Sequence, residues 1–153
     1  MGGGRWDSTS YSTASSLRSS KGIPDFKHSD DVKSGRVAPK VHPDLDPSLL
    51  KDGRRESRDS DEHPDSLPIA VFFDVTGSMG SIPQMLQKKL AKLMDVVIEK
   101  GGIKDPQILM GAIGDAPHDQ FPFQVGQFES DNRLDEQLRN IILEGDGGGQ
   151  KYE

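Results

Sequence analysis

The sequence contains no cysteine, few aromatic residues and no long apolar run. Without cysteine the chain has no disulfide, no thiol nucleophile and no zinc site with thiolate ligands. No stretch approaches the roughly 18 apolar residues of a membrane-spanning helix, and the N-terminus lacks the apolar core of a secretory signal peptide. We therefore expect a cytoplasmic protein with no membrane contact.

Clustered positive charge is also missing. The 19 Lys and Arg residues are scattered along the chain, and 25 Asp and Glu residues give a formal net charge of -6. Proteins that bind nucleic acids instead concentrate basic side chains on one face or along one helix. We therefore expect no nucleic-acid partner.

Apolar residues make up only 32% of the chain, and they are unevenly distributed. From Met1 to Ser66, Ser/Thr runs alternate with mixed charges and isolated prolines, without helical or strand periodicity. This part has too little apolar surface to offset the entropy of ordering. We predict a disordered or loosely docked arm over residues 1–66 and a folded part over residues 67–153.

The folded part shows a regular succession of patterns. Its first apolar run is short and rich in β-formers, which is typical of a strand buried on both faces. The following helix repeats apolar residues every three or four positions, so Met85 and Met94 on that stripe are expected to pack in the core. The predicted order is strand, helix, strand, strand, helix, over Pro68–Phe73, Ile82–Ile98, Gln107–Gly114, Phe121–Phe128 and Asp131–Ile142.

A candidate metal site follows the first predicted strand. The loop Asp74–Gly80 offers the carboxylate of Asp74 and the hydroxyls of Thr76 and Ser78 at alternating positions, with Gly77 expected to allow a tight bend. These hard oxygen donors suit Mg²⁺ or Mn²⁺, and open α/β folds bind ligands at the carboxyl ends of their parallel strands. A second reading is a strand-to-helix turn in which the same groups serve as local caps.

The segment Phe72–Met79 resembles the Asp-x-Ser/Thr-x-Ser signature of the metal-ion-dependent adhesion site in von Willebrand factor A-type (VWA) domains. The resemblance implies an α/β, doubly wound, Rossmann-like sheet with one antiparallel edge strand, here Phe121–Phe128. It also implies a non-enzymatic module of the bacterial or phage cytoplasmic type, which binds partners when a partner's Asp or Glu completes the metal coordination. Some family members work beside an ATPase, which makes an ATPase a candidate partner.

The resemblance covers residues 67–153, roughly half of such a domain. The family takes a further hydroxyl from a loop after the second helix and an aspartate after a later strand. The corresponding glycine-rich loop here has no Ser or Thr and offers Asp146, Gln150, Tyr152 and Glu153. In the family's order 3-2-1-4-5-6 this chain supplies strands 3, 2 and 1. We therefore expect an incomplete domain, a fragment, whose first strand is an exposed edge.

Three alternatives accompany this expectation. Asp115, His118 and Asp119 follow the second predicted strand and are either solvated turn residues or contributors to the same sheet edge. An aspartate that ends a strand also opens phosphohydrolases of the haloacid-dehalogenase type, with Asp74 as nucleophile, but the proton-handling second carboxylate is replaced by Thr76. Finally, the protein could be a structural or assembly protein that recruits partners through its arm.

Overall fold

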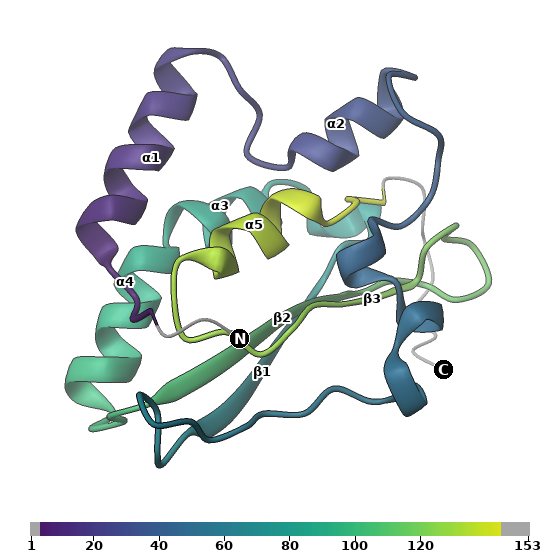
Figure 1. Cartoon of the computed structure of the whole chain (residues 1–153). Helices are drawn as coiled ribbons and strands as arrows, with labels where there is room; N and C mark the ends of the chain where they lie inside the picture. Colours follow the sequence, from purple (N-terminus) through teal and green to yellow (C-terminus); the bar gives the residue numbers. More distant parts are fainter. Residues whose placement is uncertain (1–3, 145–153) are drawn as a thin grey trace.

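The computed structural model describes residues 4–144 and shows a mixed α/β fold (Figure 1). Within this range no helix combines the length and the apolar character needed to cross a membrane. Short 3₁₀ turns lie at Pro43–Leu45, Pro47–Leu49, Lys51–Gly53 and Gly77–Met79, and a π turn at Val96–Lys100. The helices and strands are α1 (Ser8–Ser20), α2 (Lys27–Lys33), β1 (Leu67–Asp74), α3 (Ile82–Lys88), α4 (Leu90–Asp95), β2 (Pro106–Ile113), β3 (Phe123–Val125) and α5 (Arg133–Asn140).

The three strands form one mixed sheet in the order β1-β2-β3. β1 and β2 are parallel and pair without a bulge from Leu67↔Pro106 to Asp74↔Ile113, whereas β3 is antiparallel to β2. The predicted strands and the antiparallel edge are thus confirmed. β3 spans three residues rather than the predicted eight, and beyond it the chain returns to β2 through an isolated bridge between Ile108 and Glu129.

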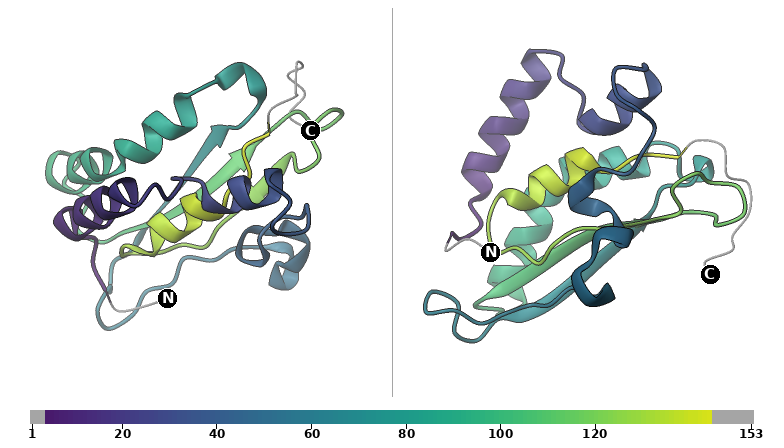
Figure 2. Two further views of the ribbon diagram at one scale, coloured as in Figure 1. Left: turned by 90° about the horizontal axis from the view of Figure 1, so that it is seen from above. Right: turned by 45° about the vertical axis from the view of Figure 1, so that its right-hand side comes forward.

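All five helices lie on one side of the sheet (Figures 1 and 2). The strand residues that face them, Phe73, Ile108, Met110 and Ala112, form one core with Leu90 and Met94 of α4 and with Leu134 and Leu138 of α5. The helices on both faces that define a doubly wound sheet are not seen among residues 4–144. The part of the prediction that the structure supports is therefore the mixed α/β class.

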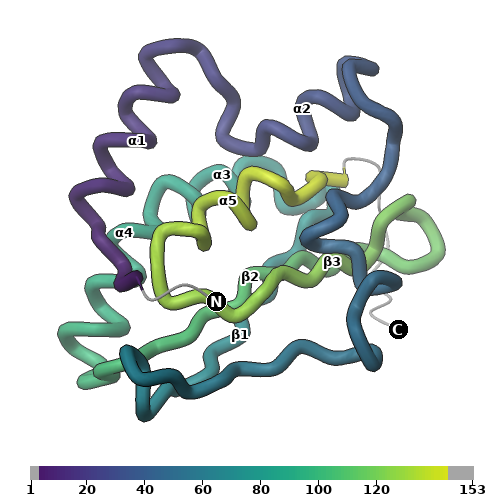
Figure 3. Tube along the Cα trace, in the orientation of Figure 1, coloured from purple at the N-terminus to yellow at the C-terminus, as the bar shows by residue number. Residues whose placement is uncertain are grey.

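The arm, expected to be disordered or loosely docked, contains α1 and α2 and contributes Tyr11, Phe26 and Leu45 to the core. Asp7 caps α1 by accepting hydrogen bonds from the amides of two residues in its first turn. Figure 3 shows α1 and α2 of the arm over the helices of residues 67–144, with α1 beside α4 and α2 beside α5. The sequence of α1 shows no helical periodicity, because this helix is stabilised mainly by contacts with segments that are distant in the sequence.

A buried ion pair fixes α1 in place. The guanidinium of Arg18 binds both carboxylate oxygens of Asp135 in α5, at 2.8 and 2.9 Å, and both side chains are only 11% exposed. Nearby, the hydroxyl of Tyr11 donates to the backbone carbonyl of Gln87 in α3. Burial raises the pKa of Tyr11, so the phenol stays protonated as a donor. α1 is therefore held by polar contacts rather than by a regular stripe of apolar side chains.

The helix predicted over Ile82–Ile98 is divided at Lys89 into α3 and α4, and it ends in the π turn. Its apolar stripe is only partly buried: Met94 is 1% exposed, whereas Met85 is 56% exposed. The core prediction is therefore confirmed for Met94 and wrong for Met85. The physical reason is that the sheet ends at β1, so part of the helix has no strand beneath it.

Candidate functional site

The candidate metal loop leaves the sheet where β1 ends. Asp74 pairs with Ile113 at the last rung of the parallel ladder, and the amide of Val75 donates to the carbonyl of Ile113 at 2.9 Å. The loop after β1 and the turn after β2 therefore leave the same edge of the sheet. This is the edge at which open α/β folds bind ligands.

The loop brings its two hydroxyls together and orients its carboxylate. The oxygens Thr76 Oγ1 and Ser78 Oγ lie 3.1 Å apart, and Asp74 Oδ1 accepts the backbone amide of Thr76 at 2.8 Å. Thr76 is buried, Asp74 is half-buried and Ser78 is exposed. The two hydroxyls are therefore adjacent, with Ser78 on the solvent side, and the Asp74 carboxylate is held by the backbone of the same loop.

The bend is made by a different glycine from the one predicted. The 3₁₀ turn Gly77–Met79 is closed by bonds from the Met79 amide to Thr76 and from the Gly80 amide to Gly77. Gly80, with φ 53°, is the loop residue in the left-handed region, and an L side chain is strained there. Gly80 rather than Gly77 is therefore the position that needs glycine for its backbone angle.

The donor set can be tested against a small octahedral cation. Two neighbouring oxygens at about 2.1 Å from Mg²⁺ in octahedral geometry lie about 3.0 Å from each other. The observed 3.1 Å between Thr76 Oγ1 and Ser78 Oγ is close to this separation, so both hydroxyls fit as adjacent ligands. The same hydrogen bonds also stabilise a strand-to-helix turn without a metal.

The turn after β2 is tightly bonded to itself. Asp115 is fully buried, and its Oδ2 lies 2.7 Å from His118 Nδ1, whose ring is largely exposed. The amide of Asp115 donates to Asp119 Oδ2 at 2.6 Å, and the Asp119 amide returns to the Asp115 carbonyl at 2.8 Å. The turn thus places two buried carboxylates at the same edge of the sheet as the candidate loop. One of them, that of Asp119, accepts a backbone amide of the turn itself.

The glycine-rich loop that could offer further oxygen donors follows α5. Asp146, Gln150, Tyr152 and Glu153 lie outside the described residues. From residue 4 to residue 144, no three His, Asp or Glu side chains lie where they could share a metal ion. The candidate loop has one carboxylate and two hydroxyls. It therefore lacks the three charged or imidazole ligands that define such a cluster.

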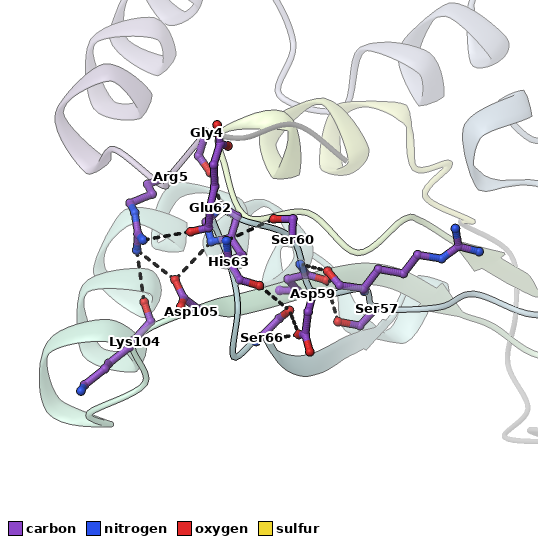
Figure 4. Close-up of polar contacts among 12 residues, drawn as sticks. Gly4, Arg5, Ser57, Asp59, Ser60, Glu62, His63, Ser66, Lys104 and Asp105 are labelled. Carbon is purple, nitrogen blue, oxygen red and sulfur yellow. Dashed lines mark hydrogen bonds and ion pairs between the residues drawn. The ribbon is translucent and has the colours of Figure 1, made fainter.

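A polar cluster that the sequence did not predict lies at the opposite end of the sheet (Figure 4). Asp105 Oδ1 accepts from Arg5 Nη1 at 3.0 Å and lies 3.2 Å from His63 Nδ1, while His63 Nε2 lies 3.0 Å from the Gly4 carbonyl. Both ring nitrogens of His63 therefore have an oxygen within hydrogen-bonding distance. Because its members are distant in sequence, no local pattern could reveal this cluster, which ties the arm to the start of β2.

A surface hollow of about 420 Å³ lies between the last turns of the arm and Gln127. Lys51, Arg54, Arg55 and Arg58 line it, but Glu56 forms ion pairs with both Arg54 and Arg58, at 3.1 and 3.0 Å. Its positive charge is therefore partly neutralised, and we place no site there.

The comparisons with known proteins identify no relative. No family model matches the chain, and no match was found among curated proteins or among solved structures. The function must therefore be argued from the geometry of the chain itself.

Proposed function

We propose that the chain is a non-enzymatic, metal-dependent protein-binding module. Asp74, Thr76 and Ser78 hold Mg²⁺ or Mn²⁺ at the carboxyl end of β1, and the bound cation supplies the positive charge that attracts an Asp or Glu of a partner protein. The observation that carries this proposal is the 3.1 Å separation of Thr76 Oγ1 and Ser78 Oγ in a loop that also orients Asp74.

The sheet supports the same proposal at a coarser level. Its order β3-β2-β1, with β1 and β2 parallel and β3 antiparallel, corresponds to strands 3, 2 and 1 of the expected 3-2-1-4-5-6 order. We propose that residues 67–153 belong to a VWA-type, doubly wound domain. An ATPase remains the candidate class of partner that the resemblance suggests.

Isothermal titration calorimetry of the full chain with MgCl₂ and with MnCl₂ tests the metal site. We expect wild type to bind one cation, and Asp74→Ala to lose binding because the only carboxylate of the loop is gone. Asp25→Ala, which removes an aspartate of the arm, is the matched control and keeps binding. Equal heats for wild type and Asp74→Ala would leave the loop as a turn stabilised by its own caps.

The enzyme alternative is tested with the same pair of proteins. A haloacid-dehalogenase-type reaction needs a second carboxylate at the position that Thr76 occupies, and a hydroxyl is too weak an acid to serve as the proton donor there. We expect no Mg²⁺-dependent hydrolysis of p-nitrophenyl phosphate by wild type. Turnover that is lost in Asp74→Ala would overturn the non-enzymatic proposal.

The arm alternative receives less support, because Tyr11 and Phe26 are buried in the protein's own core. These side chains are therefore not presented to a partner.

A further inference from the structure

Two histidine rings of the arm lie against each other and close a loop. His28 belongs to α2 and His42 precedes the turn Pro43–Leu45, yet their ring centroids lie 5.3 Å apart in an edge-to-face arrangement. His28 Nε2 also donates to the carbonyl of Lys40 at 2.9 Å. Residues 34–40 between the rings are exposed, so the two histidines join the ends of a solvated loop.

The segment around His42 carries an anchor of the arm. Leu45 is 0% exposed, and Val41 packs against the same core. The turn Pro43–Leu45 contacts both α5 and β3. Because His42 lies between these two apolar residues, its hydrogen bonds bear on how firmly this part of the arm is held.

His42 caps the turn that follows it. Its Nδ1 accepts the backbone amide of Asp44 at 3.3 Å. An imidazole nitrogen accepts a hydrogen bond only while it carries no proton of its own. The cap therefore requires a neutral His42 ring whose proton is on Nε2.

A second arrangement is available to the protonated ring. Asp44 Oδ2 lies 3.4 Å from His42 Nδ1. A proton on Nδ1 removes the acceptor for the Asp44 amide and creates a donor for the carboxylate of the same residue. The Asp44 side chain is 74% exposed, so solvent screens this ion pair. Protonation thus exchanges the cap of the turn for a weak surface pair.

The groups around His42 oppose its protonation. Burial lowers the pKa of His42, the Asp44 carboxylate raises it and the neighbouring His28 lowers it, and the net direction is downward. Arg55 adds a further positive charge beside Asp44, because its Nη2 donates to the Asp44 carbonyl at 3.1 Å. The neutral ring, and with it the cap, is therefore the form that the folded protein favours.

The direction of the pH effect follows from the number of protons bound. In the unfolded chain the pKa of His42 is about 6.5, and in the folded chain it is lower. Between the two values the unfolded chain binds more protons at this residue. The contribution of the cap is therefore fully present above about pH 6.5 and is lost as the pH falls from there through the lowered folded pKa.

We propose that His28 and His42 form a pH-sensitive latch in the arm. At neutral pH, His42 caps the turn Pro43–Leu45 and so holds residues 34–45 against α5 and β3. On acidification the charged ring gives up the cap, is repelled by His28, and this part of the arm loosens. The latch does not depend on the proposed metal site.

The first test follows the imidazole rings of the full chain by long-range ¹H–¹⁵N NMR between pH 8 and pH 5. We expect His42 to carry its proton on Nε2 at neutral pH and to titrate with a midpoint below about 6.5. His28→Gln, which keeps a donor for the Lys40 carbonyl, raises the midpoint because the repelling ring is gone. Asp44→Asn lowers it because the attracting carboxylate is gone. Asp61→Asn, which removes an exposed carboxylate further along the arm, leaves the midpoint unchanged.

The second test follows the latch itself through hydrogen exchange of the Leu45 amide, which donates to the His42 carbonyl at 2.8 Å. Exchange is read as a protection factor, so the intrinsic pH dependence of the reaction is removed. From pH 7.5 to pH 5.5 the protection is expected to fall by up to about tenfold, the ratio of charged to neutral histidine at the lower pH for an ordinary pKa. His42→Asn keeps a side-chain oxygen that caps the turn but does not titrate, so the fall is absent.

Three results overturn the proposal. They are a His42 midpoint at or above about 6.5, a midpoint that His28→Gln leaves unchanged, and an equal loss of Leu45 protection in wild type and His42→Asn. None of these measurements requires a metal ion, so EDTA in every sample keeps them separate from the test of the candidate loop.

Discussion

β1 and β2 have eight residues each and pair in register, but they differ sharply in burial. β2 is buried at seven of its eight positions although it contains Gln107 and Gly111, whereas the more apolar β1 is buried only at Phe73. β2 has a strand on each side and α5 above it, and β1 has one neighbour. The two strands therefore differ in burial because different numbers of elements pack against them, and not because of the hydrophobicity of their own residues.

The same contrast extends to the helices and the arm. On the β2 side, α5 and α1 are joined by the buried pair Arg18–Asp135, and even the arm is packed. On the β1 side, α3 and α4 leave apolar side chains in water. The molecule thus has a packed side that supplies stability and an open side, where the candidate metal loop follows β1.

The largest effect is expected from breaking the packed side at Arg18. Arg18→Ala leaves the carboxylate of Asp135 buried without its cation, and we expect a loss of about 3–5 kcal/mol in the free energy of unfolding. Urea denaturation of the full chain measures it. Lys27→Ala, which removes the solvent-screened surface pair Lys27–Asp31, is the control and is expected to leave the free energy of unfolding nearly unchanged. A similar small cost for Arg18→Ala would contradict the assignment of the arm to the packed side.

If Arg18→Ala proves too unstable to measure, the double variant R18M/D135L provides the decisive result. Replacing both charged partners by apolar side chains removes the uncompensated charge, so much of the lost stability is expected to return. No recovery would show that the pair is not the source of the loss.

A smaller effect separates the two strands directly. Ile69 and Ile108 are register partners on the same face of the sheet, but Ile108 is 1% exposed and Ile69 is only half-buried. Ile108→Ala is expected to cost about 2–5 kcal/mol because it leaves a cavity, and Ile69→Ala about half as much or less because neighbours and water can fill the space. Both values come from the same urea titrations. Equal costs would mean that β1 is as fully covered as β2 in solution.

The smallest expected effect is on the pH dependence of stability. It concerns Glu144, which bonds to the turn after β2. Burial raises the pKa of Glu144, repulsion from Asp119 raises it further, and Glu144 Oε1 accepts the Phe121 amide at 2.7 Å. Between the unfolded and the raised folded pKa the folded chain binds more protons, so this carboxyl favours folding more as the pH falls from neutral through its folded pKa. Glu144→Gln keeps the acceptor and removes the titration.

The measurement is the change in unfolding free energy between neutral pH and pH 4.5. Relative to neutral pH, Glu144→Gln is expected to be less stable than wild type at pH 4.5, because it lacks the contribution of the Glu144 carboxyl, whereas the exposed-site control Glu136→Gln follows wild type. A variant that gains stability relative to wild type on acidification would contradict the raised pKa of Glu144.

Local patterns predicted the features that depend on neighbours in sequence. The run that became β1 was found because it is short, apolar and rich in β-formers, and the repeat over α3 and α4 because a helix imposes a period of 3.6 on its side chains. The prediction that β1 is buried on both faces was wrong, since only Phe73 of this strand is buried. The loop from Asp74 to Ser78 was found in the same way, because all its donors lie within five residues. The divided helix and the short β3 were missed, since element ends depend on tertiary contacts.

The sequence by itself determined the α/β class, the order of the elements in residues 67–144 and the donors of the candidate loop. Only the tertiary structure decided which apolar residues are buried, where the arm docks and how His63, Arg5 and Asp105 meet. The physical reason is that a periodic pattern specifies which face of an element is apolar but not what covers that face. Contacts between residues about 40 to 120 positions apart cannot be predicted from local patterns, because each partner is a charged or polar residue of the kind that is common on protein surfaces.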